Sequence, residues 1–197
     1  ERDQNARRGG GLEHRDLREL WQPFSAVLEV RRVAEDHHIG VDADQLGVLE
    51  PAVGHQLGEK IRISGGGRCN FTNLDAGPQN FLSQNPHFCK SALARYTPSD
   101  FIDMVRGHGI AFHEKELGQL FCDSSSKQIV AMLLAECATA GVRIQTNCTI
   151  EAVRHGDIGF ELGTTIGTFS APALVIATGG LSIPSMGASG FGYDIAR

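Results

Sequence analysis

"KIRISGGGRCNFTN", residues Lys60 to Asn73, contains three consecutive glycines followed by an arginine, a cysteine and two asparagines. Glycine loses more conformational freedom on folding than any other residue, so an ordered glycine triplet needs a structural reason. The preceding "IRIS" alternates like a short strand, and the guanidinium of Arg68 has a planar fork that suits a phosphate group. The stretch therefore predicts a ligand-binding turn that follows a strand.

A helix is predicted over "TPSDFIDMVRGHG", residues 97–109. Thr97 is the expected N-cap, Pro98 takes the first helical position, and Asp100 stands three residues after the cap, as in a capping box. Apolar side chains then recur at helical spacing before two glycines end the pattern: Phe101, Met104, Val105, Gly107 and Gly109.

A second helix is predicted over "SSSKQIVAMLLAECATAG", residues 124–141, with a serine cap and Gly141 as terminator. Its expected core-facing residues are Ile129, Met132, Leu133 and Cys137. The short alternating runs at 142–146 and 149–153 suit strands, and residues 160–171 suit a hairpin or meander. The order of these elements indicates an α/β or α+β fold.

"ALVIATGG", residues 173–180, is an unbroken apolar run that predicts a strand buried on both faces. It ends in Thr178, Gly179 and Gly180, where ligands bind in open α/β sheets. The alternative is a tight turn that needs positive φ angles. The later "SMGASGFGYDIA", residues 185–196, is either a further approach of backbone to a ligand or a loop that enters a helix.

Composition excludes several classes of protein. The net charge of −5 gives no electrostatic footprint for nucleic acid, so we expect no nucleic-acid partner. No apolar run reaches the roughly 20 residues of a membrane span, so no membrane partner is expected. The five cysteines are never spaced C-x-x-C, which suits reduced thiols and a cytoplasmic location. The eight histidines lack the spacing of a metal site, so no metal is expected.

Cys69 is the candidate redox residue of the chain, because an adjacent arginine can lower the pKa of a thiol. The alternative, which we favour, is a packed thiol without a chemical role. No Ser/His/Asp arrangement can be assembled from spacing alone, so the catalytic residue stays unknown.

With these motifs in view, residues 58–197 resemble a bacterial family of flavoproteins. The family is labelled NAD(P)/FAD-dependent oxidoreductases, or aminoacetone-oxidase-like FAD-binding enzymes. The resemblance rests on the order and separation of three stretches: "GEKIRISGGGRCNFTN", "ELGQLFCDSSSKQIV" and "LVIATGGLSIPSMGASGFGYDIA".

The resemblance implies a partial doubly wound, Rossmann-like FAD-binding domain with a β meander. It implies an FAD-dependent oxidoreductase that acts on a small-molecule substrate and takes electrons from NAD(P)H or a small-molecule donor. By the same likeness, the flavin or its pyrophosphate would be lined by Gly65, Gly66, Gly67, Arg68, Cys69 and Asn70. Thr178, Gly179 and Gly180 would close over the cofactor, and backbone near Ile150 would meet the adenine.

The departure from the family pattern concerns residues 1–57, which have no recognisable motif. The dinucleotide fingerprint G-x-G-x-x-G is absent from the whole chain. In residues 1–57 we expect an amphipathic helix over Leu12–Trp21 and a weak strand over 24–33. We therefore divide the chain into 1–57, of unassigned origin, and 58–197, a partial FAD-binding domain.

Three interpretations of the whole chain follow. The first is a truncated or misread copy of an FAD-dependent oxidoreductase. The second is a non-enzymatic remnant that no longer binds the cofactor. The third is a nucleotide- or NAD-binding module without redox chemistry, which the triple-glycine motif disfavours.

Overall fold

The structure is a computed structural model, and it describes residues 47–49, 57–157, 159–178 and 190–197. The expected helix over 12–21 and strand over 24–33 lie outside this range. In chain order the elements are β1 (Gly47–Leu49), α3 (Glu59–Ile63), η2 (Ser64–Gly67), β2 (Asn70–Asn73), η3 (Pro78–Asn80), α4 (Lys90–Arg95), α5 (Pro98–Gly107), β3 (Phe112–Glu114), η4 (Glu116–Gly118), β4 (Gln119–Cys122), α6 (Lys127–Thr139), β5 (Arg143–Gln145), β6 (Ile150–Gly156), β7 (Gly159–Thr164), β8 (Gly167–Ala171) and α7 (Phe191–Ile195).

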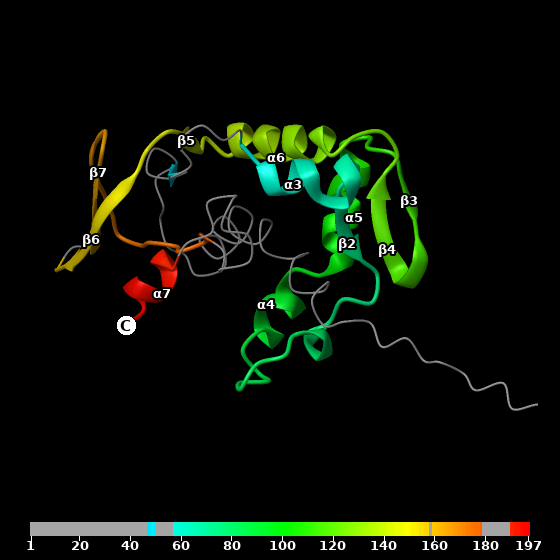
Figure 1. The fold of residues 1–197 in the computed structure, drawn as a ribbon, viewed down its shortest axis with the longest axis horizontal. Coiled ribbons are helices and arrows are strands. Elements are labelled where there is room, and N and C mark those ends of the chain that lie inside the picture. The colour runs from blue at the N-terminus through cyan, green and yellow to red at the C-terminus, as the bar shows by residue number, and fades with distance from the viewer. Residues whose placement is uncertain (1–46, 50–56, 158, 179–189) are drawn as a thin grey trace, which may run out of the picture.

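The described strands form three small sheets. β1 and β5 pair in parallel, with Val48 opposite Ile144. β2, β4 and β3 form an antiparallel sheet, and β6, β7 and β8 form the antiparallel meander that the sequence predicts. Figure 1 shows α6 running between the β2–β4–β3 sheet at one end and β5, followed by the meander, at the other. The chain therefore has the expected α/β fold, with a partial Rossmann-like architecture.

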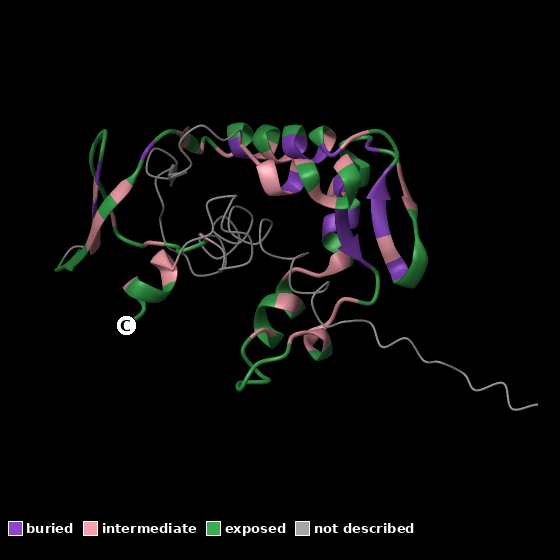
Figure 2. Cartoon of the chain, viewed as in Figure 1, coloured by how far each residue is buried: buried purple, intermediate pink, exposed green. Residues whose placement is uncertain are grey.

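The main hydrophobic core lies where α3, α5 and α6 meet β2 and β4. Phe71 of β2 is 2% exposed and packs against Phe101 of α5 and Phe112 of β3, with ring centroids 6.0 and 5.3 Å apart. Figure 2 shows this buried layer along β2, β4 and the inner side of α6. Burying one large aromatic side chain contributes about 1.5–3 kcal/mol, so these rings fix β2 against α5.

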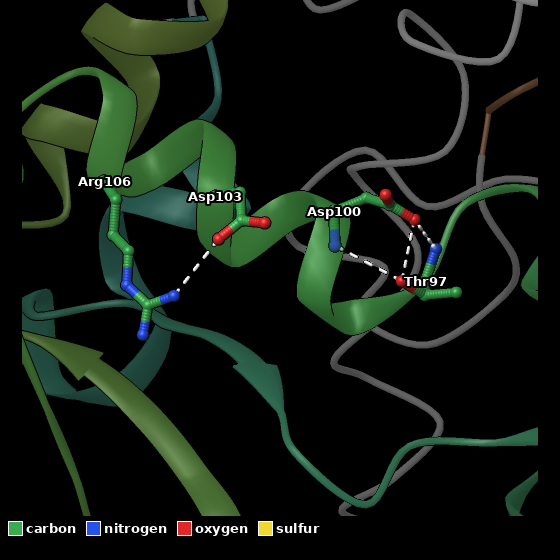
Figure 3. Close-up of polar contacts among 4 residues, drawn as sticks. All are labelled: Thr97, Asp100, Asp103 and Arg106. Carbon is green, nitrogen blue, oxygen red and sulfur yellow. Dashed lines mark hydrogen bonds and ion pairs between the residues drawn. The ribbon is translucent and has the colours of Figure 1, made fainter.

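The helix over Pro98–Gly107 confirms the predicted start. The backbone N–H of Thr97 donates to Asp100 Oδ2 at 2.7 Å, and the backbone N–H of Asp100 donates to Thr97 Oγ1 at 3.3 Å (Figure 3). Phe101 and Val105 are buried and Met104 is half-buried, as the spacing predicts. Arg106 and Asp103 form an ion pair on the opposite, exposed face.

The helix over Lys127–Thr139 is also confirmed, but its cap differs in detail. Ser126 occupies the N-cap position, and its hydroxyl donates to the carbonyl of Arg62 at 2.7 Å instead of bonding within its own helix. The predicted core residues Ile129, Met132 and Cys137 are buried, and Leu133 is half-buried. Gly141 ends the element with a φ of +70°, as expected of a C-terminal glycine.

The predicted strand over "IRIS" is wrong, because these residues belong to helix α3 and the turn after it. Ile61 and Ile63 alternate in sequence, but Ile61 is 5% exposed and Ile63 is 55% exposed. A Cβ built on Gly58 would lie 2.9 Å from Val130 Cγ2, so α3 begins in close contact with α6. Packing against α6, rather than local β propensity, decides this element.

The predicted buried strand at 173–178 is also wrong in the described structure. These residues form no strand, and Val175 and Ile176 are 57% and 41% exposed. A strand buried on both faces needs paired strands beside it and helices over both faces. The described part of the chain supplies neither to this run.

No helix within the described ranges has both the length and the apolar character needed to cross a bilayer.

Candidate functional site

The glycine triplet forms a tight left-handed turn between α3 and β2. Gly65, Gly66 and Gly67 have φ angles of +58°, +66° and +87°, and Cys69 adds a φ of +52°. Left-handed backbone costs a residue with a side chain roughly 1–2 kcal/mol, which is why glycine fills three of the four positions.

Hydrogen bonds fix this turn to two other elements. The N–H of Ser126, at the start of α6, donates to the carbonyl of Gly67 at 2.8 Å. The N–H of Cys122, at the end of β4, donates to the carbonyl of Arg68 at 3.0 Å. Ser64 Oγ donates to the carbonyl of Ile61 at 2.8 Å. The turn is therefore held in position by the core, which a binding loop needs if it is to meet a ligand preorganised.

The two sides of the turn differ in how crowded they are. A Cβ built on Gly65 would lie 2.5 Å from Cε1 of Phe121 and 2.9 Å from the backbone nitrogen of Asn70. At Gly66 and Gly67 a built Cβ would meet no described atom within 4 Å. Gly65 is thus required by packing, whereas the backbone at Gly66 and Gly67 is open to a ligand.

Two buried polar atoms of β2 lie directly after the turn. Asn70 and Thr72 are 7% and 3% exposed, and Asn70 Oδ1 and Thr72 Oγ1 have no hydrogen-bond partner in the described structure. An unpaired buried polar group costs about 1–3 kcal/mol, so such atoms call for an explanation. Asn70 Oδ1 can accept a hydrogen bond from a hydroxyl or ring N–H of FAD, so the residues present fit that cofactor.

Arg68 and Cys69, neighbours in sequence, differ in exposure. Arg68 is exposed, as a residue that meets a phosphate must be. Cys69 is 0% exposed, and its burial raises the pKa of the thiol to about 11. Burial, together with the adjacent Cys69, also raises the pKa of Cys122 to about 12. The idea of a Cys69 thiol with a lowered pKa is therefore wrong, because burial raises this pKa instead, and the packed-thiol alternative holds.

The remaining predicted site residues lie apart from this turn. Ile150 is half-buried at the start of β6, and Figure 1 shows β6 at the opposite end of α6 from β2. Thr178 Oγ1 is buried without a partner in the described structure, and a Cβ built on Gly192 of α7 would lie 3.2 Å from it. Gly179 and Gly180 lie outside the described residues. The structure thus brings together residues 65–70 and leaves Ile150 and Thr178 elsewhere.

Of the late glycine run at 185–196, the structure describes residues 190–196, where Gly190 is the N-cap of helix α7. This arrangement favours the interpretation as a loop that enters a helix, although Gly187 lies outside the described range.

Sequence reasoning missed a row of side chains beside the turn. Asn70, Phe121 and His113 are directly paired across β2, β4 and β3, so they share one face of the sheet. His113 stacks on Phe121 with centroids 6.4 Å apart, and its Nδ1 lies 2.6 Å from Asp123 Oδ1. Lys115 Nζ lies 4.0 Å from the Phe121 ring centroid. Only the strand register reveals this row, because its members are far apart in sequence.

A second histidine–carboxylate pair lies elsewhere, where His108 Nε2 is 2.7 Å from Glu136 Oε1. No group of three or more His, Cys, Asp or Glu side chains in the described structure is arranged to hold a metal ion.

Comparison with known proteins gives a family match. The family model described as the HI0933-like protein Rossmann domain matches residues 42–197.

Three curated relatives are similar to parts of this chain. A protein of Escherichia coli strain K12 named ribosomal RNA dihydrouridine synthase is 57% identical over 144 residues, which cover 73% of this chain and 36% of that protein. A Haemophilus influenzae protein of the same name is 50% identical over 148 residues, which cover 73% of this chain and 37% of that protein. A 3-dehydro-bile acid delta(4,6)-reductase of Clostridium scindens is 27% identical over 142 residues, which cover 72% of this chain and 34% of that protein. The chain spans about a third of the length of each relative.

Proposed function

Because the chain belongs to the HI0933-like Rossmann-domain family, which is FAD-binding, we propose that it forms the FAD-binding part of a flavin-dependent reductase. The observation that carries this proposal is the fixed left-handed turn at Gly65–Gly67. Its backbone is open at Gly66 and Gly67, and the buried, unpaired Asn70 Oδ1 follows it. Glycine-rich turns of this kind let a cofactor approach the backbone closely.

We assign the roles of the residues as follows. The backbone of Gly66 and Gly67 would lie against the cofactor, and Asn70 Oδ1 would accept a hydrogen bond from it. The exposed guanidinium of Arg68 would pair with its pyrophosphate, because a planar fork matches phosphate oxygens. Cys69 supports the turn by packing, with no part in the chemistry. The domain division at residue 58 and the roles of Ile150 and Thr178–Gly180 remain part of the proposal.

The reaction class follows from what the names of the relatives have in common. A dihydrouridine synthase and a delta(4,6)-reductase both reduce a carbon–carbon double bond conjugated with a carbonyl group. FAD, which the backbone of Gly66 and Gly67 together with Arg68 and Asn70 would hold, would supply the hydride chemistry that such a reduction needs. NAD(P)H is the proposed source of the electrons.

The proposed substrate of the complete protein is a uridine of ribosomal RNA, since the relatives that are 57% and 50% identical bear that name. The bile-acid reductase is 27% identical and carries less weight. An aminoacetone-oxidase-like reaction, the oxidation of a small amine, would use the same cofactor site, but the relatives' names favour reduction.

The test is a titration of the purified chain with FAD, followed by flavin fluorescence and polarisation. We expect saturable binding that Asn70→Leu weakens roughly threefold to tenfold, the value of about one hydrogen bond. The same variant should not lower the free energy of unfolding of the free chain, because it removes an unpaired buried carbonyl.

Asn80→Ala is the matched control. Asn80 Oδ1 accepts a hydrogen bond from the N–H of Gly77 at 2.9 Å, outside the turn. This variant should lower stability slightly and leave FAD affinity unchanged. An unchanged affinity in Asn70→Leu would place the cofactor elsewhere. Absence of binding by the unmodified chain would favour the remnant interpretation.

A further inference from the structure

Residues 76–99, which run from the loop after β2 into the first turn of α5 and are flanked by Asp75 and Asp100, differ in charge from the rest of the chain. The whole chain has a net charge of −5, but this segment contains no Asp or Glu and carries Lys90 and Arg95. It also holds His87 and the aromatic residues Phe81, Phe88 and Tyr96. We call it the 76–99 segment. The net charge of this segment is therefore positive, whereas the net charge of the whole chain is negative.

The 76–99 segment extends away from the core. In Figure 1, α4 and the turns before it lie below α5, on the far side from β3 and β4. Figure 2 shows that most of this part is exposed. Phe88 is 82% exposed and Leu82 is 58% exposed, while His87, Lys90 and Arg95 are also exposed. Among the described residues, no carboxylate forms an ion pair with Lys90 or Arg95.

The exposed Phe88 is held by an ordered turn. Asn85 N–H donates to Ser83 Oγ at 3.1 Å, and Ser83 Oγ donates to the carbonyl of Asn85 at 2.7 Å. The N–H of His87 donates to Asn85 Oδ1 at 3.1 Å, and the N–H of Phe88 donates to the carbonyl of Asn85 at 3.2 Å. The turn therefore presents Phe88 to solvent in a fixed backbone geometry, with Lys90 two residues further along.

A groove in this segment is lined by Pro78, Leu82, Pro86 and Lys90 among others, and Pro86 and Lys90 flank Phe88 in the sequence. Its lining is mostly apolar, and its polar side chains are the amide of Gln79, the hydroxyl of Ser83 and the ammonium group of Lys90. A base can stack on an aromatic face while cations hold the phosphates on either side of it, which is how single-stranded RNA is bound without base pairing.

We propose that the 76–99 segment is a contact surface for single-stranded RNA. Phe88 stacks against a base, and Lys90 and Arg95 contact phosphates. This inference rests on the proposed function, because ribosomal RNA is the substrate proposed for the complete protein. It departs from the expectation of no nucleic-acid partner, which was based on the net charge of the whole chain and is untested.

RNA fits this surface better than a membrane or an apolar protein partner. Two basic residues are too few for stable electrostatic attachment to a lipid surface, which uses clusters of four or more. Lys90 is among the residues that line the groove, and an apolar protein partner would leave its ammonium group without a counter-charge.

The test measures the anisotropy of a fluorescein-labelled, single-stranded oligouridylate of about twelve nucleotides, titrated with the purified chain at several salt concentrations. We expect saturable binding that Phe88→Ala weakens about fivefold or more, the effect of losing one stacked base. Lys90→Gln combined with Arg95→Gln should lower the slope of log affinity against log salt by about 1.4, the value for two phosphate contacts to a single strand.

The matched controls lie on the meander. Phe169 of β8 is 38% exposed and the side chain of Arg154 of β6 is 72% exposed, so Phe169→Ala and Arg154→Gln remove similar groups elsewhere. Both should leave RNA affinity unchanged. Equal weakening by the controls and by Phe88→Ala would overturn the proposal, as would absence of RNA binding. Adsorption to phosphatidylglycerol vesicles without RNA binding would also overturn it.

FAD affinity is measured on the same samples. Phe88→Ala should leave it unchanged, because Phe88 lies outside the glycine turn. Intact FAD binding without RNA binding would overturn only the RNA surface. RNA binding that depends on Phe88, in a chain that binds no FAD, would overturn only the cofactor proposal.

Discussion

At the scale of single residues, the glycine triplet contains positions with two different requirements. Gly65 needs both its positive φ and the absence of a Cβ, because Phe121 lies against it. Gly66 needs only its positive φ, since the space beside it is open in the described structure. The three glycines look alike in the sequence, and the neighbours that distinguish them come from β2 and β4.

The difference can be measured by substitution with alanine. Gly66→Ala should lower the free energy of unfolding by roughly 1–2 kcal/mol, the cost of left-handed backbone. Gly65→Ala should lower it by a further 1–3 kcal/mol or so, because the methyl group overpacks against Phe121 and Asn70. Urea denaturation of the two variants gives both values. Equal losses would mean that Phe121 does not pack against Gly65 in solution.

The buried thiol of Cys69 makes stability depend on alkaline pH. Its folded pKa of about 11 exceeds the ordinary value of 9.0, so the folded state holds the proton more tightly than the unfolded state. Below about pH 9 the thiol is protonated in both states and its contribution is complete. Between about pH 9 and 11 the unfolded state loses the proton first, so the free energy of unfolding falls as pH rises.

The expected slope from one such thiol is at most about 1.4 kcal/mol per pH unit. Cys69→Ala should therefore flatten the decline between pH 9 and 10.5, relative to the unmodified chain, in urea denaturation. Between pH 7 and 8 the two proteins should show the same pH dependence, which serves as the internal control. Cys122, whose pKa is also raised, keeps part of the decline in the variant, and a wholly unchanged decline would contradict a buried Cys69 thiol.

At the scale of elements, α5 supports the site indirectly. Phe101 of α5 packs against Phe71 of β2, and β2 also carries Asn70. The capping box of Thr97 and Asp100 fixes the first turn of this helix (Figure 3). The position of β2 therefore depends on the start of α5.

Thr97→Ala should lower the free energy of unfolding by about 1 kcal/mol, because it leaves the N–H of Asp100 without its cap. The neighbouring Ser99→Ala is the matched control, since Ser99 is exposed in the same turn and alanine favours the helix. Thermal unfolding followed by circular dichroism compares the two. Equal stability of both variants would contradict a functioning cap.

At the scale of the whole molecule, the described structure has one well-packed region and one poorly covered run. The packed region joins α3, α5 and α6 to the β2–β4–β3 sheet, whereas residues 173–178 are mostly exposed. Amides in the packed region should exchange slowest with deuterium, because their opening requires much of the core to unfold.

Residues 173–178 should exchange faster than the packed region, since they form no strand and are mostly exposed. Hydrogen exchange read by mass spectrometry tests this order, with β4 and α6 as the slow reference. Strong protection over 173–178 would mean that this run is a paired strand in solution, as the sequence predicts.

The sequence predicted the elements whose signals are local. The capping box at Thr97, the helical spacing around Ile129 and the alternation in the meander each arise from neighbouring residues, and each is confirmed. Prediction from the sequence failed where contacts between distant residues compete with the local preference for helix or strand. The alternation of Ile61 and Ile63 indicated a strand, but contact with α6 makes that segment a helix.

The candidate site likewise has features that follow from neighbouring residues and features that follow from contacts between distant residues. The sequence by itself determined that a glycine turn followed by a polar strand is present, because three adjacent glycines permit a backbone that other residues resist. Only the tertiary structure decided which side of the turn is open, that Cys69 is a packed thiol, and that Asn70, Phe121 and His113 share one face of a sheet. The physical reason is that burial and strand register depend on contacts between residues far apart in the chain, which no local pattern encodes.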